Sequence, residues 1–287
     1  MSTPPTILAI GATGRFAGLV VPELVRRGAI VRALVRSADK AAAARHQGAA
    51  EVAVGDLRDM RSLGAAASGA DAVFHIGPAF QPDEAELGVR MVEAAKRAGI
   101  QRFVFSSVIQ PTNTALRNHA SKIPVEAALF NSGMQYTILH PANFFQNIGG
   151  AWRAVLETGT FAEPFPTTSR IARVDYRDVA EVAAIALTED RLAYGSFELC
   201  AGMPNREEIA AIMSDVLGRP IKAAEMPFNE WAAKMNLSYD NEQMRLLANV
   251  HAHYAQHGSG GNSLTLRAIL GREPRSLRHY IEEISSM

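Results

Sequence analysis

The sequence predicts an α/β fold, a doubly wound parallel sheet with a smaller, mainly helical C-terminal lobe. Short β-branched runs alternate with helical patterns from residue 6 to about residue 140, which is typical of parallel strands joined by right-handed crossovers. Several runs are apolar almost throughout, as strands covered on both faces must be. The expected strands are 6–11, 29–36, 50–56, 71–77, 102–108 and 135–141. The expected helices are Phe16–Arg27, Asp39–Gln47, Met60–Ala67, Glu84–Ala98 and Ile123–Asn131.

Pro22 conflicts with the first expected helix. A proline inside a helix removes a hydrogen bond and crowds the carbonyl four residues earlier. That carbonyl belongs to Gly18, which has no side chain and leaves room for a bend. We therefore expect this helix to be kinked.

The pattern changes after residue 150. The stretch VDYRDVAEVAAIALTED (174–190) predicts a helix, and GSFELCA (195–201) predicts a further strand. In PNREEIAAIMSDVLG (204–218), Asn205 and Glu208 have the spacing of a capping box, so a helix should begin there.

Composition excludes several classes of protein. The 29 Lys and Arg residues balance the 29 Asp and Glu residues, so net charge does not point to nucleic acid or to an anionic membrane. A single cysteine, Cys200, excludes an intrachain disulfide, and the eight histidines show no metal-ligand spacing. The N-terminal MSTPPTILAI does not read as a signal peptide, and no segment is apolar enough to span a membrane. We expect a cytoplasmic monomer or homodimer without a metal.

A glycine-rich loop connects the first expected strand to the first expected helix. Gly11 should make the tight turn, Gly14 should let a pyrophosphate approach the backbone, and Ala17 should let the helix pack on the strand. The start of the helix adds free N–H groups and the positive end of its dipole. This arrangement predicts a dinucleotide-binding site, although a tight turn alone can use the same glycines.

The domain organisation follows from this loop. We expect residues 1–150 to form an NAD(P)-binding Rossmann domain, to which 174–201 returns. Residues 151–173 and 202–287 should form a substrate-binding lobe over the ends of the strands.

The second strand ends at Arg36, where an NAD-specific site would offer an acidic residue to the ribose. A guanidinium suits a 2′-phosphate, and Arg15 in the glycine loop could assist it, so we expect NADP, with NAD possible. Both arginines could instead be solvated surface residues. The expected cofactor contacts are Gly11, Thr13, Gly14, Arg15, Phe16, Ala17, Arg36, Asp56, Leu57, Gly77, Pro78, Lys122, Pro141, Asn143 and Phe144.

The stretches GATGRFAG, VRALVRS, GDLRD, FVFSSV and YTILHPANFFQN follow one another at distances that resemble the NmrA-like branch of the atypical short-chain dehydrogenases. The likeness covers nearly the whole chain, including GNSLTLRAILGREPRSLRHYIEE. This branch includes a transcription corepressor, redox-sensing NADPH binders, and quinone or triphenylmethane-dye reductases. The resemblance implies a nucleotide-binding fold, a small substrate lobe and bound NAD(P).

The sequence departs from the usual Tyr-x-x-x-Lys pair of short-chain dehydrogenases. In NHASKIPVEAALF, Lys122 matches the lysine, but Asn118 stands four residues earlier and cannot donate a proton. The candidate catalytic residues are therefore Lys122, His119 and Ser106, with Ser107 as an alternative to Ser106. Lys122 could instead bind only ribose or cap a helix, and His119 could be an ordinary hydrogen-bonded histidine.

The stretch HPANFFQN should form a loop beside the nicotinamide. Asn143 could orient its carboxamide, and aromatic residues could form the wall of a pocket for a small aromatic substrate, although one of the two phenylalanines could be a core residue. The candidate pocket residues are Phe80, Phe145, Trp152, Phe161 and Trp231.

Two functions fit these observations. The first is an NAD(P)H-dependent oxidoreductase that delivers hydride to a conjugated or aromatic carbonyl or a quinone, for example an aromatic polyketide. Such acceptors delocalise the developing charge and need little proton donation, which suits a site without the tyrosine. The second is a non-catalytic redox sensor that binds NAD(P) and a partner protein, which the asparagine in the tyrosine position favours.

Overall fold

A computed structural model describes residues 3–286 and contains a seven-stranded sheet of the predicted doubly wound type. The strand order is β10-β6-β5-β4-β1-β2-β3, and β1 to β6 pair in parallel. The order reverses between β1 and β4, which is the point where open α/β sheets bind ligands. The strands are β1 (Thr6–Ile10), β2 (Ile30–Val35), β3 (Glu51–Val54), β4 (Ala72–Ile76), β5 (Arg102–Ser106), β6 (Gln135–Pro141) and β10 (Gly195–Leu199).

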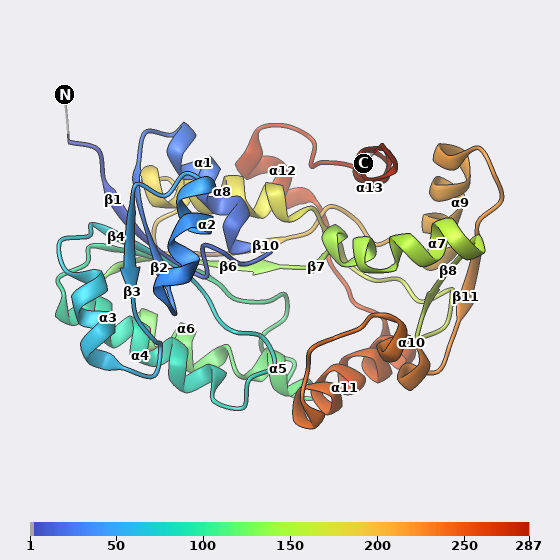
Figure 1. Cartoon of the computed structure of the whole chain (residues 1–287), viewed down its shortest axis with the longest axis horizontal. Coiled ribbons are helices and arrows are strands. Elements are labelled where there is room, and N and C mark those ends of the chain that lie inside the picture. Colours follow the sequence, from blue (N-terminus) through green and yellow to red (C-terminus); the bar gives the residue numbers. More distant parts are fainter. Residues whose placement is uncertain (1–2, 287) are drawn as a thin grey trace. The chain divides into compact units, whose positions relative to one another are not determined.

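Helices cover both faces of this sheet. Figure 1 shows α3, α4 and α6 along one face, with α1, α2 and α8 along the other. This is the arrangement that right-handed crossovers produce when the strand order reverses at β1. The helices are α1 (Val20–Arg26), α2 (Ala41–His46), α3 (Met60–Ala67), α4 (Glu84–Arg97), α5 (Arg117–Ala120), α6 (Ile123–Phe130) and α8 (Tyr176–Thr188), with short 3-10 turns at Ala17–Leu19 (η1) and Ala38–Lys40 (η2).

The conflict at Pro22 is resolved in a way that the sequence did not predict. The segment starts with the 3-10 turn η1, and α-helical structure begins only at Val20. Pro22 therefore lies in the first turn of α1, where a residue needs no N–H donor within the helix. The segment changes from 3-10 to α-helix just before Pro22, so the proline does not lie in the interior of a longer α-helix as expected.

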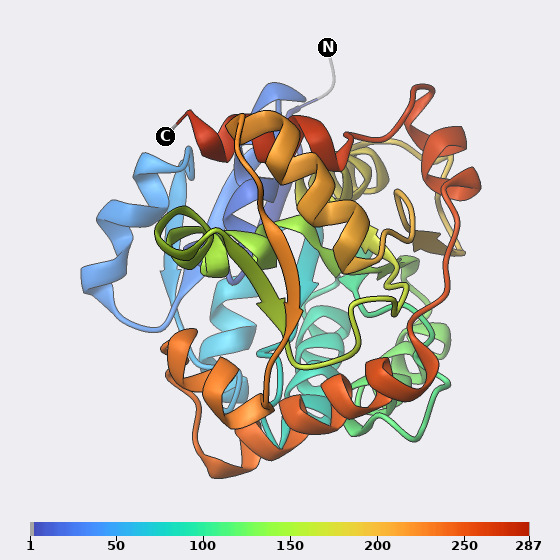
Figure 2. The same ribbon diagram turned by 90° about the vertical axis from the view of Figure 1, so that its right-hand side faces the viewer.

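The chain divides into two compact units. Unit 1 contains residues 1–140 and 179–197, and unit 2 contains residues 141–178 and 198–287. Unit 2 has two small parallel pairs, β8 with β11 and β7 with β9, and Figure 2 shows the first pair side by side. Its elements are β7 (Asn143–Phe144), η3 (Phe145–Ala151), α7 (Trp152–Thr158), β8 (Thr160–Glu163), β9 (Arg173–Val174), α9 (Arg206–Leu217), β11 (Lys222–Glu225), α10 (Phe228–Lys234), α11 (Asn241–His257), α12 (Leu264–Leu270) and α13 (Leu277–Ser285).

The predicted capping box is present at the start of α9. The Asn205 side chain accepts a hydrogen bond from the Glu208 N–H (2.8 Å), and the Glu208 carboxylate accepts one from the Asn205 N–H (3.1 Å). These two bonds satisfy donors that the first turn of a helix leaves without intrahelical partners.

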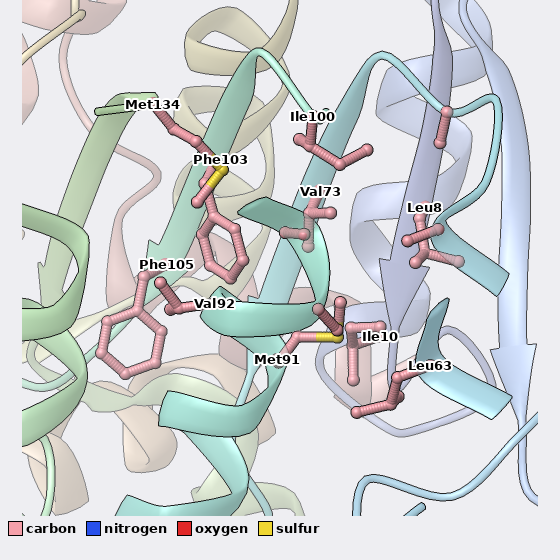
Figure 3. Packing of buried hydrophobic residues seen from close by; sticks show 14 of the residues in the cluster. Leu8, Ile10, Leu63, Val73, Met91, Val92, Ile100, Phe103, Phe105 and Met134 are labelled. Carbon is pink, nitrogen blue, oxygen red and sulfur yellow. The ribbon is translucent and has the colours of Figure 1, made fainter. Parts of the chain in front are cut away.

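One hydrophobic core of unit 1 lies between the sheet and helices α3, α4 and α6. Figure 3 shows Leu8 and Ile10 of β1, Phe103 of β5, and Met91 of α4 packed in this layer, together with their neighbours. All four side chains are buried. A core of this kind fixes the strands in register, so that the loops at their carboxyl ends are held in defined positions.

Candidate functional site

The glycine loop adopts a tight turn immediately after β1. Gly11 has φ +75°, a conformation that favours glycine, and its carbonyl accepts a hydrogen bond from the Gly14 N–H (2.7 Å). A Cβ on Gly14 would lie 3.0 Å from the Gly11 oxygen, and Ala17 is buried where η1 begins. The backbone is therefore exposed at Gly11 and Gly14 and closely packed at Ala17, as the sequence predicts.

A cavity of about 450 Å³ adjoins this loop. Thr13, Gly14 and Arg15 line it from the loop, and His46 and Gln47 line it from the end of α2. The Arg15 guanidinium lies over the ring of Phe16, 5.6 Å from its centre. A cationic side chain beside exposed backbone at the start of a helical segment suits a phosphate group, so the residues present fit a dinucleotide.

Two further predicted contacts lie on neighbouring strand ends. Arg36 is exposed immediately after β2. Asp56 is exposed after β3, and its carboxylate accepts a hydrogen bond from the Arg58 N–H (2.8 Å), so part of its role is to hold the turn. Leu57 is half-buried and packs against the core of unit 1.

The loop after β4 contains a strained residue. Gly77 and Pro78 are half-buried, and a Cβ on Gly77 would lie only 2.8 Å from a Glu84 carboxylate oxygen. Phe80 has φ +64°, which is a genuine outlier for a bulky side chain. Strain of this kind is concentrated at ligand-binding positions, which makes Phe80 a candidate for contact with a ligand.

Lys122 forms a buried ion pair that the sequence did not predict. Its ammonium group donates a hydrogen bond to Glu84, and their side chains are 9% and 3% exposed. Ser121 donates a further hydrogen bond to the other Glu84 oxygen (3.2 Å). Lys122 therefore offers a cation that Glu84 already partly neutralises.

His75 lies near this ion pair inside the sheet. Its ring stacks on Phe105 with centres 5.6 Å apart, and neither ring nitrogen has a hydrogen-bond partner in the described part of the chain. Burial, helped by the charge of Lys122, lowers the pKa of His75 from 6.5 to about 3. The imidazole is therefore neutral at ordinary pH.

The other candidate polar residues follow β5. Ser106 and His119 are both buried, and His119 Nδ1 lies 3.3 Å from the carbonyl oxygen of Gln110, a residue with φ +52°. The next serine, Ser107, donates a hydrogen bond to Glu126 (2.5 Å). Ser107 therefore belongs to a buried polar group that includes Glu126.

In unit 2, Pro141 is buried and Asn143 is held by its own neighbours. The Asn143 side-chain oxygen accepts hydrogen bonds from Arg173 (3.2 Å) and Asn147 (3.3 Å). Phe144 is half-buried against Tyr176, with ring centres 4.7 Å apart. These contacts fix the orientation of Asn143.

The candidate pocket aromatics of unit 2 separate into two groups. Phe145 and Phe161 are buried in the core of this unit, with Trp152 packed against it. Trp231 is half-buried and contacts His251, with ring centres 4.5 Å apart. Phe145 and Phe161 therefore serve in packing, whereas the half-buried tryptophans retain accessible surface.

A buried charge cluster supports the same unit. Burial raises the pKa of Glu163, but Arg173 and Arg206 more than offset this effect and hold it below its usual value. Burial also lowers the pKa of His251 from 6.5 to about 4. The carboxylate between two guanidinium groups links β8, β9 and α9.

Residues 3–286 contain neither a candidate metal site nor a candidate membrane-spanning helix. Within this range, no cluster of three or more metal-ligating side chains occurs. Within it too, no helix has the length and apolar character needed to cross a membrane.

Sequence reasoning missed Glu84, Glu126 and His140 as members of the polar clusters. A signal was present for two of them, because Glu126 interrupts the apolar run IPVEAALF and His140 interrupts TILHP. A charged residue within an apolar run is rarely buried unless it is paired.

The fold and the tight glycine turn after β1 are those of Rossmann-type nucleotide-binding proteins. A sequence model of the NmrA-like family matches residues 3–282, and the chain belongs to this family. The NAD(P)H azoreductase of Xenophilus azovorans is 32% identical over 226 residues, which cover 75% of each chain.

Two solved structures share the fold. The NADPH complex of the Escherichia coli quinone oxidoreductase QOR2 superposes with a TM-score of 0.84 at 23% identity, covering 98% of this chain and 99% of that one. The Citrobacter sp. triphenylmethane reductase gives a TM-score of 0.86 at 22% identity, covering 99% and 100%. The azoreductase, the quinone oxidoreductase and the triphenylmethane reductase are all oxidoreductases. Because the two solved structures are only 22–23% identical to this chain, they establish its fold alone.

Proposed function

We propose that this protein is an NAD(P)H-dependent reductase that delivers hydride to a flat, conjugated acceptor, namely a quinone or an aromatic carbonyl such as a polyketide. The observation that carries the proposal is the glycine loop, with φ +75° at Gly11, exposed backbone at Gly14 and an adjoining cavity. The azoreductase among the relatives supports adding azo compounds to the acceptor class. The fold of two cofactor-dependent reductases gives further support.

The cofactor would be held by residues of unit 1. The loop backbone at Gly11 and Gly14 would face the pyrophosphate, and Arg15 and Arg36 would pair with a 2′-phosphate, which favours NADP over NAD. When bound, the nicotinamide supplies the hydride, and the protein supplies orientation and electrostatics.

Lys122 would contribute positive charge near the end of β4, because its partner Glu84 lies beside Gly77. Because Glu84 accepts a hydrogen bond from its ammonium group, the side chain is fixed in one position and carries little net charge. This arrangement suits holding a ribose hydroxyl or a weakly charged oxygen better than stabilising a full oxyanion. His119 and Ser106 remain proposed partners of the substrate oxygen.

Two features support this class of acceptor, namely the missing tyrosine and the half-buried aromatic side chains. Asn118 occupies the position of the usual tyrosine, so the family's phenolic proton donor is missing there. A quinone or an extended aromatic carbonyl delocalises the developing charge and tolerates this loss. In unit 2, Phe144, Trp152 and Trp231 are half-buried aromatic side chains whose accessible surface suits contact with such a flat molecule.

The test is a turnover assay with a panel of acceptors. NADPH oxidation should be measured with a naphthoquinone, an aromatic ketone and an azo dye, and calorimetry should give the affinities for NADPH and NADH. We expect turnover with the quinone and tighter binding of NADPH. Cofactor binding without turnover of any acceptor would refute the reductase.

The alternative is a non-catalytic sensor that binds NAD(P) and a partner protein. Asn118 in the tyrosine position and the pairing of Lys122 with Glu84 favour it. The same assay separates the two functions, because a sensor binds the cofactor and reduces nothing.

A further inference from the structure

Three polar side chains form a hydrogen-bonded chain at the carboxyl ends of β5 and β6. The Ser107 hydroxyl donates to Glu126 Oε1 (2.5 Å), and His140 Nε2 lies 3.0 Å from the same oxygen. Ser107 and Glu126 are buried, and the His140 side chain is only 12% exposed.

The backbone holds this chain in place. Ser107 directly follows β5, and its N–H donates to the Leu139 carbonyl of β6 (2.8 Å). His140 is the next residue of β6, and Glu126 lies on the buried side of α6. All of these residues belong to unit 1. The group therefore lies at the sheet edge where α/β proteins bind their ligands.

A carboxylate that contacts both an imidazole and a hydroxyl can pass a proton between them. Burial of all three groups is costly unless each is hydrogen-bonded, and here the Ser107 hydroxyl and His140 Nε2 meet at one carboxylate oxygen. Imidazole and carboxyl groups are the side chains that most often transfer protons in enzymes. Ser107, Glu126 and His140 are needed neither for the turn of the glycine loop nor for the ion pair of Lys122 with Glu84.

We propose that Ser107, Glu126 and His140 form a proton relay that protonates the substrate atom left negative by hydride transfer. This inference rests on the proposed reductase function and deepens it. The relay replaces the missing tyrosine. It matters most for acceptors whose anion is strongly basic, such as an azo nitrogen, and least for quinones, whose phenolate is stable in water.

The step balances for an azo group. A hydride adds to one nitrogen, the N=N bond loses its π pair to the other nitrogen, and that nitrogen takes the proton of the Ser107 hydroxyl. Ser107 recovers a proton from Glu126, Glu126 takes the Nε2 proton of His140, and His140 takes a proton at Nδ1 from a water molecule, which leaves as hydroxide into the solvent. The azo group is reduced by two electrons to a hydrazo group, and the nicotinamide is oxidised by two.

Glu126→Gln tests the relay because it keeps the size of the side chain and removes the group that carries the proton. We expect kcat for an azo dye to fall by about 100-fold or more, and kcat for a naphthoquinone by less than about tenfold. The matched control is Glu93→Gln on α4, an exposed carboxylate that forms a surface ion pair with Arg97 and should leave both rates unchanged. Ser107→Ala should reproduce the selective loss.

A structural role predicts a different result. If Glu126 only supports the fold, Glu126→Gln lowers both rates by the same factor, and this outcome would overturn the relay while leaving the reductase function intact. Reduction of quinones but of no azo or ketone acceptor by the unaltered protein would also overturn it. Failure to reduce anything would refute both proposals.

A second measurement does not depend on turnover or on any variant. The ¹⁵N chemical shifts of the His140 ring report which nitrogen carries a proton in the unaltered protein. The relay requires a proton on Nε2, which faces Glu126. An unprotonated Nε2 would contradict it even if Glu126→Gln failed to fold.

Discussion

Replacement of Lys122 by methionine tests the buried ion pair with Glu84. Methionine keeps much of the length and apolar contact of the lysine stem but removes the charge. The remaining Glu84 carboxylate, with its side chain 3% exposed, would keep the hydrogen bond from the Ser121 hydroxyl but lose its counter-charge. Breaking a buried pair by removing one partner costs about 3–5 kcal/mol, because an uncompensated charge stays buried. We expect a loss of this size in the free energy of unfolding.

The double variant isolates the interaction. Glu84→Gln alone leaves the Lys122 ammonium buried without a counter-charge, so it should also destabilise the protein. In Lys122→Met combined with Glu84→Gln no charge remains, and the loss should be smaller than the sum of the two single losses by on the order of 1–3 kcal/mol.

Urea unfolding at neutral pH measures these differences as shifts of the midpoint at constant m value. The matched control is Lys234→Met, because Lys234 and Glu230 form an ion pair whose side chains are about half exposed. This surface pair should contribute less than about 0.5 kcal/mol. Equal losses for Lys122→Met and Lys234→Met, or strictly additive losses in the double variant, would refute the buried pair.

The remaining predictions concern the cofactor and acid stability. Gly14→Val should abolish NADPH binding in calorimetry while circular dichroism shows an intact fold, because a branched side chain would crowd the Gly11 oxygen and block the pyrophosphate; unchanged affinity would contradict the loop assignment. Arg36→Ala should weaken NADPH by about 1.5–3 kcal/mol, roughly ten- to a hundredfold, and NADH little, whereas equal losses would give Arg36 another role. Because burial lowers the pKa of His75 from 6.5 to about 3, the unfolded chain binds a proton that the folded chain does not, so stability is lost as pH falls from 6.5 toward 3. By about pH 5 this loss should reach about 2 kcal/mol, and urea unfolding should show a flatter pH dependence in His75→Phe; an unchanged slope would refute it.

The fold could be predicted because its signals are local. The strand after Pro5, the turn at Gly11 and the capping box at Asn205 each depend on residues within a few positions, and the structure confirms the elements they predict. The α-helix begins at Val20 and not at Phe16 as expected, so Pro22 lies in its first turn, and the 3-10 turn that precedes it was not predicted.

The polar clusters could not be predicted because their members are distant in sequence. Lys122 and Glu84 are separated by 38 positions, and neither residue's burial follows from the local pattern. Sequence spacing identified Lys122 as a candidate but gave no information about its partner. The partner decides whether the lysine offers a full charge or a neutralised one.

Polar residues within apolar runs are where local and tertiary requirements conflict. His75 interrupts the apolar run AVFHI of β4, Glu126 interrupts IPVEAALF of α6, and His140 interrupts TILHP of β6. An apolar residue at each place would satisfy packing at lower cost, since a buried polar group must find a hydrogen-bond partner. Glu126 and His140 are hydrogen-bonded to each other, whereas neither ring nitrogen of His75 has a hydrogen-bond partner among the described residues. Proton transfer requires hydrogen-bonded groups near the ligand, and Glu126 and His140 at the carboxyl edge of the sheet meet this requirement. His75 is a neutral imidazole inside the sheet without a hydrogen-bond partner among the described residues, so we assign it no role in proton transfer and expect it only to make the fold sensitive to acid.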